Sequence, residues 1–423
     1  MKIKIVTMAF LITSSALLAH DIEVDNQKNE RAESVRDVIN NIGEPEEKNI
    51  STAEKFKNMF KNGKVTGQIR AMYAGYDFKN DTDTYATSLG GQLKYELAQL
   101  NGFNGAVAFY TANDLDFATG DGAKQNNELS SSKGHYTDVT EAYINYKKEG
   151  FNFRGGRQLL DTPLADSDDI RMIPNTFEAY VATLNMGSFT FLAANIQKWQ
   201  GYDAGLDDGW QKTGENGTWM ASVSFSNDNF ESSAWYYKIT KSVDAYYIDS
   251  SLNRKINENT TLTASAQALI EKELNGSANE ADIYGASAEA QFYGFGVNIA
   301  YNKAVVPKGK QSFSGFGGGT LFTSMDTMIL DNIAVDRDAD AVVGGASYVY
   351  KSLNLFYAYG DFKGDKDSLN QKAHIVEQNV GFEYDMNENF RVSAVYAVEE
   401  NKEIPGDAAT NFNRLQIMAA YNF

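Results

Sequence analysis

Residues able to carry acid–base or nucleophilic chemistry are sparse in this sequence. Only three histidines occur, His20, His135 and His374, and there is no cysteine. The chain therefore has no disulfide, no thiol nucleophile, no Cys-based metal site and no lipidated cysteine. A barrel hydrolase would need His135 or His374 to approach a serine and an aspartate in the fold. We do not expect an enzyme, and no cofactor or metal is predicted.

Adjacent carboxylates form a second group with binding chemistry. Asp168 with Asp169, and Asp207 with Asp208, could hold Ca²⁺ at an outer rim. They lack the spacing of an EF-hand loop, so solvated loop charges are the favoured interpretation. The whole chain carries 38 Lys and Arg against 56 Asp and Glu, a formal charge of -18. This acidity argues against a nucleic-acid partner.

Four basic residues occupy polar positions within segments that alternate between apolar and polar residues. They are Arg70, Lys94, Arg391 and Arg414, and we call them the basic wall. Each is opposite in phase to its apolar neighbours, so all four are expected on the inner face of a closed sheet. Closure makes the last strand the neighbour of the first. The four residues then lie on four consecutive strands.

The basic wall is expected to run along the axis of such a closed sheet rather than around it. If the short turns are periplasmic, Arg414 lies near the external end, Arg70 near the middle, and Lys94 and Arg391 near the periplasmic end. Such a stripe would guide anionic groups such as carboxylates through the pore. The alternative is four isolated, solvated charges in a wide channel.

The elements that position these side chains are short alternating segments that begin at Lys64. Alternation with period two indicates strands with one apolar and one polar face. One clear example sets Leu262, Ala264, Ala266 and Ala268 against Thr263, Ser265 and Gln267. About eighteen strands are predicted, beginning near Lys64, Thr84, Gly102, Thr140, Gly150, Phe177, Ser188, Thr218, Phe230, Asp244, Thr260, Ala281, Phe295, Asp340, Leu353, Glu377, Phe390 and Asn413.

The connections alternate between short turns and mostly long loops. The long loops are Ala112 to Asp138, Leu159 to Thr176, Lys198 to Gly217, Lys303 to Ala339 and Lys363 to His374. Short periplasmic turns opposite long external loops are typical of outer-membrane barrels. The sequence therefore predicts an all-β fold, a transmembrane antiparallel β-barrel of about eighteen strands. A barrel of this size with a polar inner face is wide enough for an aqueous channel.

A secreted β-sandwich or β-solenoid would also show alternating strands and polar loops. Aromatic residues at strand ends, such as Phe295 and Tyr301, argue instead for girdles at two membrane interfaces. The chain also ends in a strand from Asn413 to Phe423, with Phe423 on its apolar face. This ending resembles the signal that the barrel-assembly machinery reads, so that machinery is an expected partner.

The region before the strands divides into two parts. Residues 1–19 are expected to be a signal peptide, because a short basic start precedes an apolar run that is too short for a membrane anchor. Residues 20–62 form a polar, helical or disordered extension in which Glu30 to Ile42 and Ser51 to Phe60 have helical patterns. Residues 63–423 are the predicted barrel domain.

Residues 156–178 are the most distinctive segment of the chain. A Gly156-Arg157-Gln158 strand end leads into an Asp-rich turn, Arg171, Pro174 and a Thr176-Phe177 pair. The order and spacing resemble the third external loop of the OprD-type outer-membrane porin family. The resemblance also covers the opening Phe60 to Arg70, the strand count and the terminal strand, and so extends over residues 56–423.

Members of this family are eighteen-stranded channels in which the third loop folds inward to narrow the pore, with basic residues on the wall near the first and last strands. The resemblance implies that Asp166, Asp168, Asp169 and Arg171 lie at or support the constriction, facing the basic wall. An acidic loop opposite a basic wall would orient dipolar solutes. The alternative is that these residues only fix the loop to the barrel through salt bridges.

The favoured function is a porin of the cell outer membrane that passes small hydrophilic solutes and ions, with a preference for carboxylate-bearing molecules such as amino acids or organic acids. An adhesin or structural surface barrel, using the long loop Lys303 to Ala339, is the alternative. A plugged active transporter is disfavoured because residues 20–62 are too few for a plug. Outer-membrane lipid and lipopolysaccharide are expected partners, and the protein is expected as a monomer or a loose homotrimer.

Overall fold

A computed structural model describes residues 51–423 of the chain. The predicted signal peptide and the predicted helix Glu30 to Ile42 lie outside the described residues. Within residues 51–423, no helix has the length and apolar character needed to cross a membrane. The predicted helix over Ser51 to Phe60 is present as α2 (Thr52–Lys61), and the Ser51 hydroxyl accepts a hydrogen bond from the Glu54 amide, as an N-cap does.

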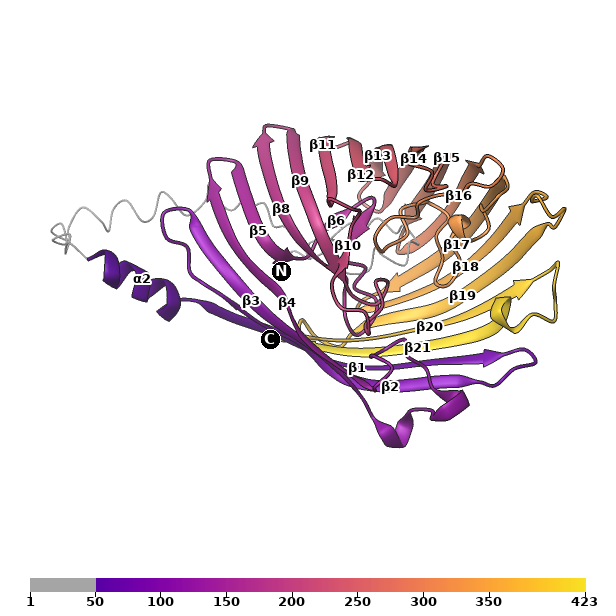
Figure 1. The fold of residues 1–423 in the computed structure, drawn as a ribbon, viewed down its shortest axis with the longest axis horizontal. Helices are drawn as coiled ribbons and strands as arrows, with labels where there is room; N and C mark the ends of the chain where they lie inside the picture. Colours follow the sequence, from indigo (N-terminus) through magenta and orange to yellow (C-terminus); the bar gives the residue numbers. More distant parts are fainter. Residues whose placement is uncertain (1–50) are drawn as a thin grey trace.

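Eighteen antiparallel strands form a closed barrel (Figure 1). Closure is made by the first and last strands, where Ile69 pairs with Tyr421 and Phe78 with Phe412. The barrel strands are β1 (Lys64–Phe78), β2 (Thr84–Glu96), β3 (Phe103–Asp114), β4 (His135–Lys148), β5 (Phe151–Gln158), β8 (Thr176–Met186), β9 (Phe189–Gln200), β11 (Thr218–Ser226), β12 (Phe230–Ile239), β13 (Val243–Asn257), β14 (Thr260–Glu273), β15 (Ala281–Phe292), β16 (Phe295–Val305), β17 (Ala339–Tyr350), β18 (Leu353–Gly364), β19 (Ala373–Asp385), β20 (Phe390–Asn401) and β21 (Asn411–Asn422). Three two-residue strands, β6 (Asp161–Thr162), β7 (Ala165–Asp166) and β10 (Gln211–Lys212), belong to loops.

The predicted strand number is confirmed, and most predicted starts fall within one or two residues of the observed ones. The largest errors are at β4, which begins at His135 rather than Thr140, and β19, which begins at Ala373 rather than Glu377. At the loop end, both strands continue with residues that no longer alternate between apolar and polar. The alternation is expected only where the outer face meets lipid, whereas the hydrogen bonds between strands continue beyond the membrane. The pattern therefore underestimates strand length at the loop end.

The outer and inner faces of the barrel follow the predicted alternation. In β14, Leu262 is 44% exposed on the outer face, while Gln267 on the inner face is 5% exposed. Phe295, the first residue of β16, and Tyr301, six residues further along, are also exposed on the outer face, as membrane girdle residues are. The exterior is therefore the apolar, aromatic-bordered surface of an outer-membrane barrel.

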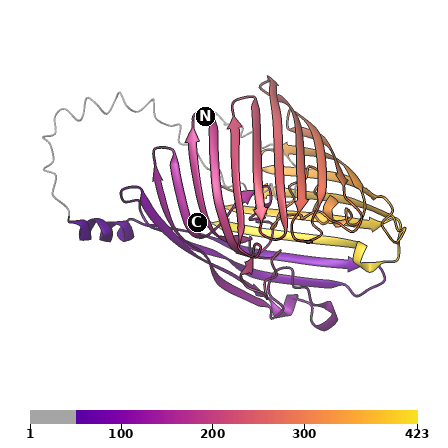
Figure 2. The same cartoon turned by 45° about the horizontal axis from the view of Figure 1, so that its top comes forward.

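Two long loops fold into the barrel instead of extending outward. One comprises residues 159–175 and contains the β6–β7 hairpin; the other comprises residues 306–338 and contains the short helix η4 (Leu330–Asn332). A backbone bridge between Ala165 and Phe316 joins them. Figure 2 shows loop segments inside the ring of strands.

An apolar core forms where these two loops meet the wall. Leu164 and Phe316 from the loops pack in one cluster with the inward side chains Ile196, Tyr237 and Ile283. The lumen is therefore narrower than the wide channel expected from the strand number, because loop residues fill much of it along β8 to β18. Polar and charged contacts of the loops gather at the opposite wall, where β20, β21, β1 and β2 are neighbours.

Candidate functional site

The basic wall occupies four consecutive strands, as its placement in the sequence predicts. Arg391 is on β20, Arg414 on β21, Arg70 on β1 and Lys94 on β2. Arg391 and Arg70 lie in one cross-strand row, because Ala420 pairs with both of them. Arg414 lies nearer the long-loop end, and Lys94 and Arg391 nearer the short-turn end.

Arg70 binds the inward loop directly. Its two terminal nitrogens donate to the two Asp169 carboxylate oxygens at 2.7 and 2.9 Å, and its Nε donates to Gln68 at 2.7 Å. A further hydrogen bond reaches the backbone carbonyl of Arg171. Arg70 is only 2% exposed. Paired guanidinium–carboxylate bonds of this kind fix orientation as well as charge, so the strand and the loop hold each other in one geometry.

Arg414 forms the second contact between the wall and the loops. It is fully buried and pairs with Glu128 of the β3–β4 loop and with Asp326 of the 306–338 loop, the latter at 2.5 Å. Glu128 also forms an ion pair with Arg171, whose Nε lies 3.0 Å from the carboxylate. Two loops therefore meet at Arg414, and the loop of residues 159–175 joins them through the Arg171–Glu128 pair. We call Arg70, Asp169, Arg171, Glu128, Arg414 and Asp326 the constriction network.

The electrostatics of Glu128 show how strongly the network is coupled. Burial by itself would raise the pKa of this carboxyl group, but the guanidinium groups of Arg414 and Arg171 outweigh burial and hold the pKa below its ordinary value. Glu128 is therefore a buried carboxylate shared by two arginines. Neither Glu128 nor Asp326 is identifiable from the sequence, because each lies in a loop without periodicity.

Lys94 and Arg391 complete the basic wall and also have acidic partners. Lys94 donates to Glu141 at 2.7 Å, and Tyr110 donates to the same carboxylate at 2.9 Å. Arg391 donates to Asp385 at 2.6 Å. All four wall residues thus form ion pairs, which differs from both sequence interpretations, a free basic stripe and isolated solvated charges. The basic wall is therefore a row of ion pairs between basic and acidic side chains.

Asp166 and Asp168 of the inward loop form no ion pair with the wall arginines within residues 51–423. Asp166 accepts the Asp168 backbone N–H at 2.7 Å, and Asp168 has a left-handed backbone with φ of 41°. Burial raises the pKa of Asp166 to about 7, with Asp161 and Asp203 adding to the effect. Burial and the neighbouring Asp203 raise the pKa of Asp168 to about 8. These two carboxyl groups shape the loop, whereas Asp169 and Arg171 make the ionic contacts.

The long loop of residues 306–338 is held inside the barrel by carboxylates of the wall. Glu377 on β19 accepts the backbone N–H groups of Thr327 at 3.1 Å and Met328 at 2.7 Å. Glu399 accepts the Thr327 hydroxyl at 2.8 Å. Glu377 and Glu399 are opposite each other on paired strands. This turn places Asp326 against Arg414.

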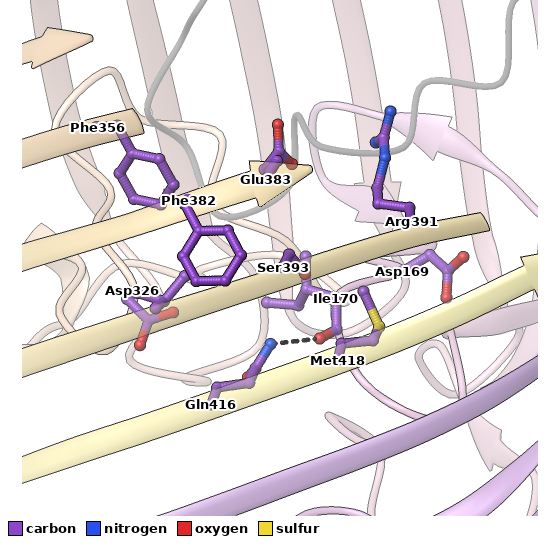
Figure 3. A pocket seen from close by; sticks show the side chains of 11 residues that line it. Asp169, Ile170, Asp326, Phe356, Phe382, Glu383, Arg391, Ser393, Gln416 and Met418 are labelled. Atoms are coloured by element: carbon purple, nitrogen blue, oxygen red, sulfur yellow. Dashed lines mark hydrogen bonds between the residues drawn. The ribbon is translucent and has the colours of Figure 1, made fainter. Parts of the chain in front are cut away.

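An open pocket lies between these loops and the wall (Figure 3). Its empty volume is about 560 Å³. Charged side chains of both signs face it, namely Asp169, Asp326, Glu383 and Arg391, and Gln416 donates to the Ile170 carbonyl at 3.0 Å across its floor. Phe356 and Phe382 form an apolar side. A solute in this pocket meets carboxylates, a guanidinium group and an aromatic face together.

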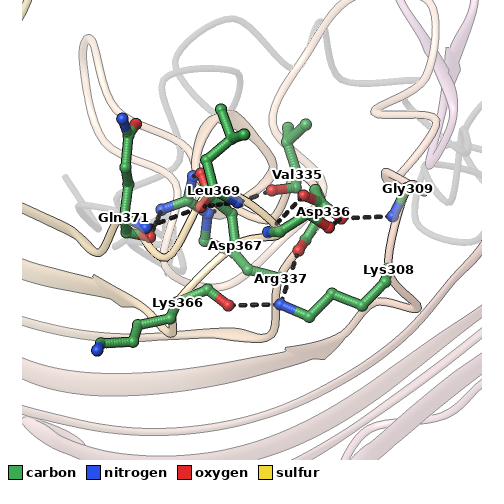
Figure 4. Close-up of polar contacts among 10 residues, drawn as sticks. Lys308, Gly309, Val335, Asp336, Arg337, Lys366, Asp367, Leu369 and Gln371 are labelled. Carbon is green, nitrogen blue, oxygen red and sulfur yellow. Dashed lines mark hydrogen bonds and ion pairs between the residues drawn. The ribbon is translucent and has the colours of Figure 1, made fainter.

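The outer end of the 306–338 loop is tied to the β18–β19 loop (Figure 4). Asp336 accepts from the backbone N–H of Gly309 and from that of Ser368, the latter at 2.7 Å. These bonds, together with the Ser368 hydroxyl, lower the pKa of Asp336 to about 2. Arg337 pairs with Asp367 at 2.7 Å. The loop of residues 306–338 is therefore fixed at its outer end, near Asp336, as well as at the turn that contains Thr327 and Met328.

The remaining candidates from the sequence have structural contacts. Asp207 accepts from the backbone and hydroxyl of Ser132 at 3.0 Å each. His374 contacts Asp361 at 2.7 Å, and His135 contacts the Lys133 carbonyl at 3.2 Å. Neither imidazole bonds a serine in residues 51–423. In the same residues, no three acidic or histidine side chains are arranged to hold a metal ion.

A closed barrel with inward loops and apolar outer faces defines a transmembrane β-barrel of the outer-membrane type. No known protein-family model matches the sequence, and no curated protein matches it. Solved structures do match. OccAB2 of Acinetobacter baumannii gives a TM-score of 0.73 at 15% identity, and OccAB3 of the same organism 0.74 at 12%. OpdK of Pseudomonas aeruginosa, solved with vanillate, gives 0.73 at 14%.

Each of these three matches covers 86% of this chain and 99% of the matched chain. The structural neighbours are Occ and Opd porins of the OprD family, and the resemblance predicted from the sequence is confirmed at the level of the fold. At such low identity the likeness concerns the fold, so the roles of individual residues rest on the geometry of this chain.

Proposed function

We propose that this protein is an outer-membrane porin, a water-filled channel through which small hydrophilic solutes and ions diffuse passively. The observation that carries the proposal is the constriction network. Two wall arginines, Arg70 and Arg414, face acidic residues supplied by three loops, and the open pocket of about 560 Å³ lies beside them. Arg391 and Asp169 are partly exposed at this pocket, and charged side chains exposed inside a closed barrel require water.

We further propose a preference for solutes that carry a carboxylate, with amino acids favoured over simple organic acids. Arg391 is 28% exposed at the pocket and offers a guanidinium group to a carboxylate, while Asp169, 27% exposed, offers a partner for an ammonium group. Opposite charges across a narrow passage orient a dipolar solute. The carboxylate vanillate in the neighbouring OpdK structure is consistent with this solute class.

The adhesin interpretation receives less support from the structure. It required the loop from Lys303 to Ala339 to be available at the cell surface. That loop turns inward, where Thr327 and Met328 bind Glu377 and Thr323 binds Asn302. A loop anchored in the lumen is better suited to restricting passage than to contacting another cell.

Solute uptake into liposomes containing the refolded protein tests the proposal. Glycine, acetate and a neutral sugar of small size are compared in swelling assays, with protein-free liposomes as the control. We expect swelling with all three solutes and the highest size-corrected rate with glycine. Absence of swelling from a folded barrel would contradict the porin proposal. Equal size-corrected rates would leave the porin standing and contradict the carboxylate preference.

A further inference from the structure

A hollow with an empty volume of about 680 Å³ opens on the outer wall of the barrel, outside the pore. It lies where the last two strands meet the first two, along the lower edge of the barrel in Figure 1. One cross-strand row forms its centre, since Tyr396 pairs with Leu415, Leu415 with Gly75, and Gly75 with Tyr85. A glycine in the middle of a row of large side chains leaves a notch.

The floor of the notch is the phenol ring of Tyr73. A Cβ atom added at Gly75 would lie 2.4 Å from the Tyr73 hydroxyl oxygen, so this ring extends over the glycine. Within the described chain, the hydroxyl groups of Tyr73, Tyr85 and Tyr396 have no hydrogen-bond partner. We call Tyr73, Gly75, Tyr85, Tyr396 and Leu415 the outer cup. Tyrosines at a membrane interface direct their hydroxyls toward polar headgroups, so these three are available to bind one.

A polar rim lies on the loop side of the outer cup. Asp77 and Asn413 are paired residues of β1 and β21, and Asp83 lies in the β1–β2 turn. Lys124 belongs to the β3–β4 loop, which is bound along the edge of β2 because Gly120 donates to the Tyr85 carbonyl at 2.9 Å. Within residues 51–423, Lys124 has no carboxylate within ion-pair distance. The rim thus offers acceptors and one unpaired ammonium group.

We propose that the outer cup binds the phosphorylated sugar headgroup of an outer-leaflet glycolipid. The cup is on the lipid-facing wall, so its occupant must come from the membrane, and its rim is on the external side if the long loops are external. The tyrosine rings stack against the apolar face of a sugar. The carboxylates of Asp77 and Asp83 accept hydrogen bonds from sugar hydroxyls, and the Lys124 ammonium group pairs with a phosphate. The inference rests on the membrane orientation of the proposed porin, but not on its conductance.

Native mass spectrometry of the refolded full chain in detergent tests the proposal, with purified lipid A as the probe and phosphatidylglycerol as the competitor. Gly75→Leu fills the notch, and the atoms that it displaces all belong to the far end of the Tyr73 side chain. Gly344→Leu is the matched control. Gly344 also faces outward, between Ile299 and Tyr359, and an added Cβ there meets nothing closer than 3.9 Å.

We expect one lipid A per barrel, bound about tenfold more weakly by Gly75→Leu and unchanged in Gly344→Leu. Lys124→Ala and Tyr85→Ala should each weaken binding, and they remain informative if Gly75→Leu does not fold. Equal binding by the wild type and the cup variants would overturn the proposal. Equal competition by phosphatidylglycerol would also overturn it, because the site would then select negative charge rather than sugar. Conductance should stay unchanged in all variants, which separates this test from that of the porin.

Discussion

Arg70 on the first barrel strand holds Asp169 of the inward loop through two parallel hydrogen bonds, at 2.7 and 2.9 Å. The two residues are 99 positions apart in the sequence. Their contact converts a surface loop into one wall of the constriction. It also neutralises a guanidinium group that would otherwise attract anions.

Asp169→Asn removes this neutralising charge while preserving the shape of the side chain. We expect the channel to become more anion-preferring, because Arg70 then contributes an uncompensated positive charge to the passage. The reversal potential under a salt gradient measures the change. Asp121→Asn, at an exposed position in the β3–β4 loop, is the control and should leave selectivity unaltered. A reversal potential identical to that of the wild type would show that Asp169 does not set the field in the pore.

The position of Arg70 was predictable from the sequence, whereas the residues that pair with the arginines were mostly not. Strict alternation placed Arg70 and Arg414 on the inner face, and chain closure placed their strands side by side. The segment that contains Asp169 was recognisable by its resemblance to a family loop. Glu128 and Asp326 belong to other loops, whose paths depend on tertiary contacts rather than on a repeating pattern.

One signal for the second inward loop was present in the sequence. Leu321, Phe322, Met328 and Leu330 are large apolar residues in a segment expected to face water, and all four are buried in the structure. Apolar residues concentrated in a long loop indicate that the loop packs against another part of the protein. The sequence does not specify the surface, since the wall residues that receive the loop are contributed by many strands.

Glu128→Gln should destabilise the folded barrel. The substitution leaves Arg171, and in part Arg414, buried without a carboxylate partner. Removing one member of a buried ion pair costs about 3 to 5 kcal/mol, and we expect about 3 kcal/mol because Asp326 still pairs with Arg414. Urea unfolding in lipid vesicles measures the free energy of unfolding. Glu149→Gln, in an exposed turn, should change it by less than about 0.5 kcal/mol, and an equal effect of both variants would argue against a buried network.

The inward conformation of residues 159–175 should weaken as the pH rises. Asp166 and Asp168 have pKa values of about 7 and about 8 in the folded loop, against about 3.9 for a free aspartate. Between pH 4 and 8 the closed loop therefore retains protons that an opened loop releases, so closure loses stability as the pH increases through this range.

Channel conductance recorded between pH 5 and 9 tests this expectation. Larger or noisier currents are expected above pH 8 than at pH 5. Asp168→Asn should reduce the dependence, since asparagine is uncharged and tolerates the left-handed backbone at this position. A wild-type conductance that does not vary with pH would contradict the role of these two carboxyl groups.

Glu377→Ala should release the loop of residues 306–338 from the wall. The variant removes the acceptor of the Thr327 and Met328 backbone N–H groups, which then lie unpaired unless the turn moves. We expect a conductance increase of roughly twofold with frequent fluctuations, because freed loop segments no longer occupy a fixed part of the lumen. Glu400→Ala, at an exposed position on the neighbouring strand, provides the comparison. Quiet, wild-type currents from Glu377→Ala would indicate that the rim contacts alone hold the loop.

Single-channel recording of the refolded wild-type protein in a planar lipid bilayer shows whether the barrel conducts. We expect discrete, steady conductance steps in symmetrical salt, and a current that decreases when millimolar glycine or acetate occupies the pocket beside Arg391. A folded barrel that inserts into the bilayer but conducts no ions would contradict the proposal that the constriction is an open, water-filled pore.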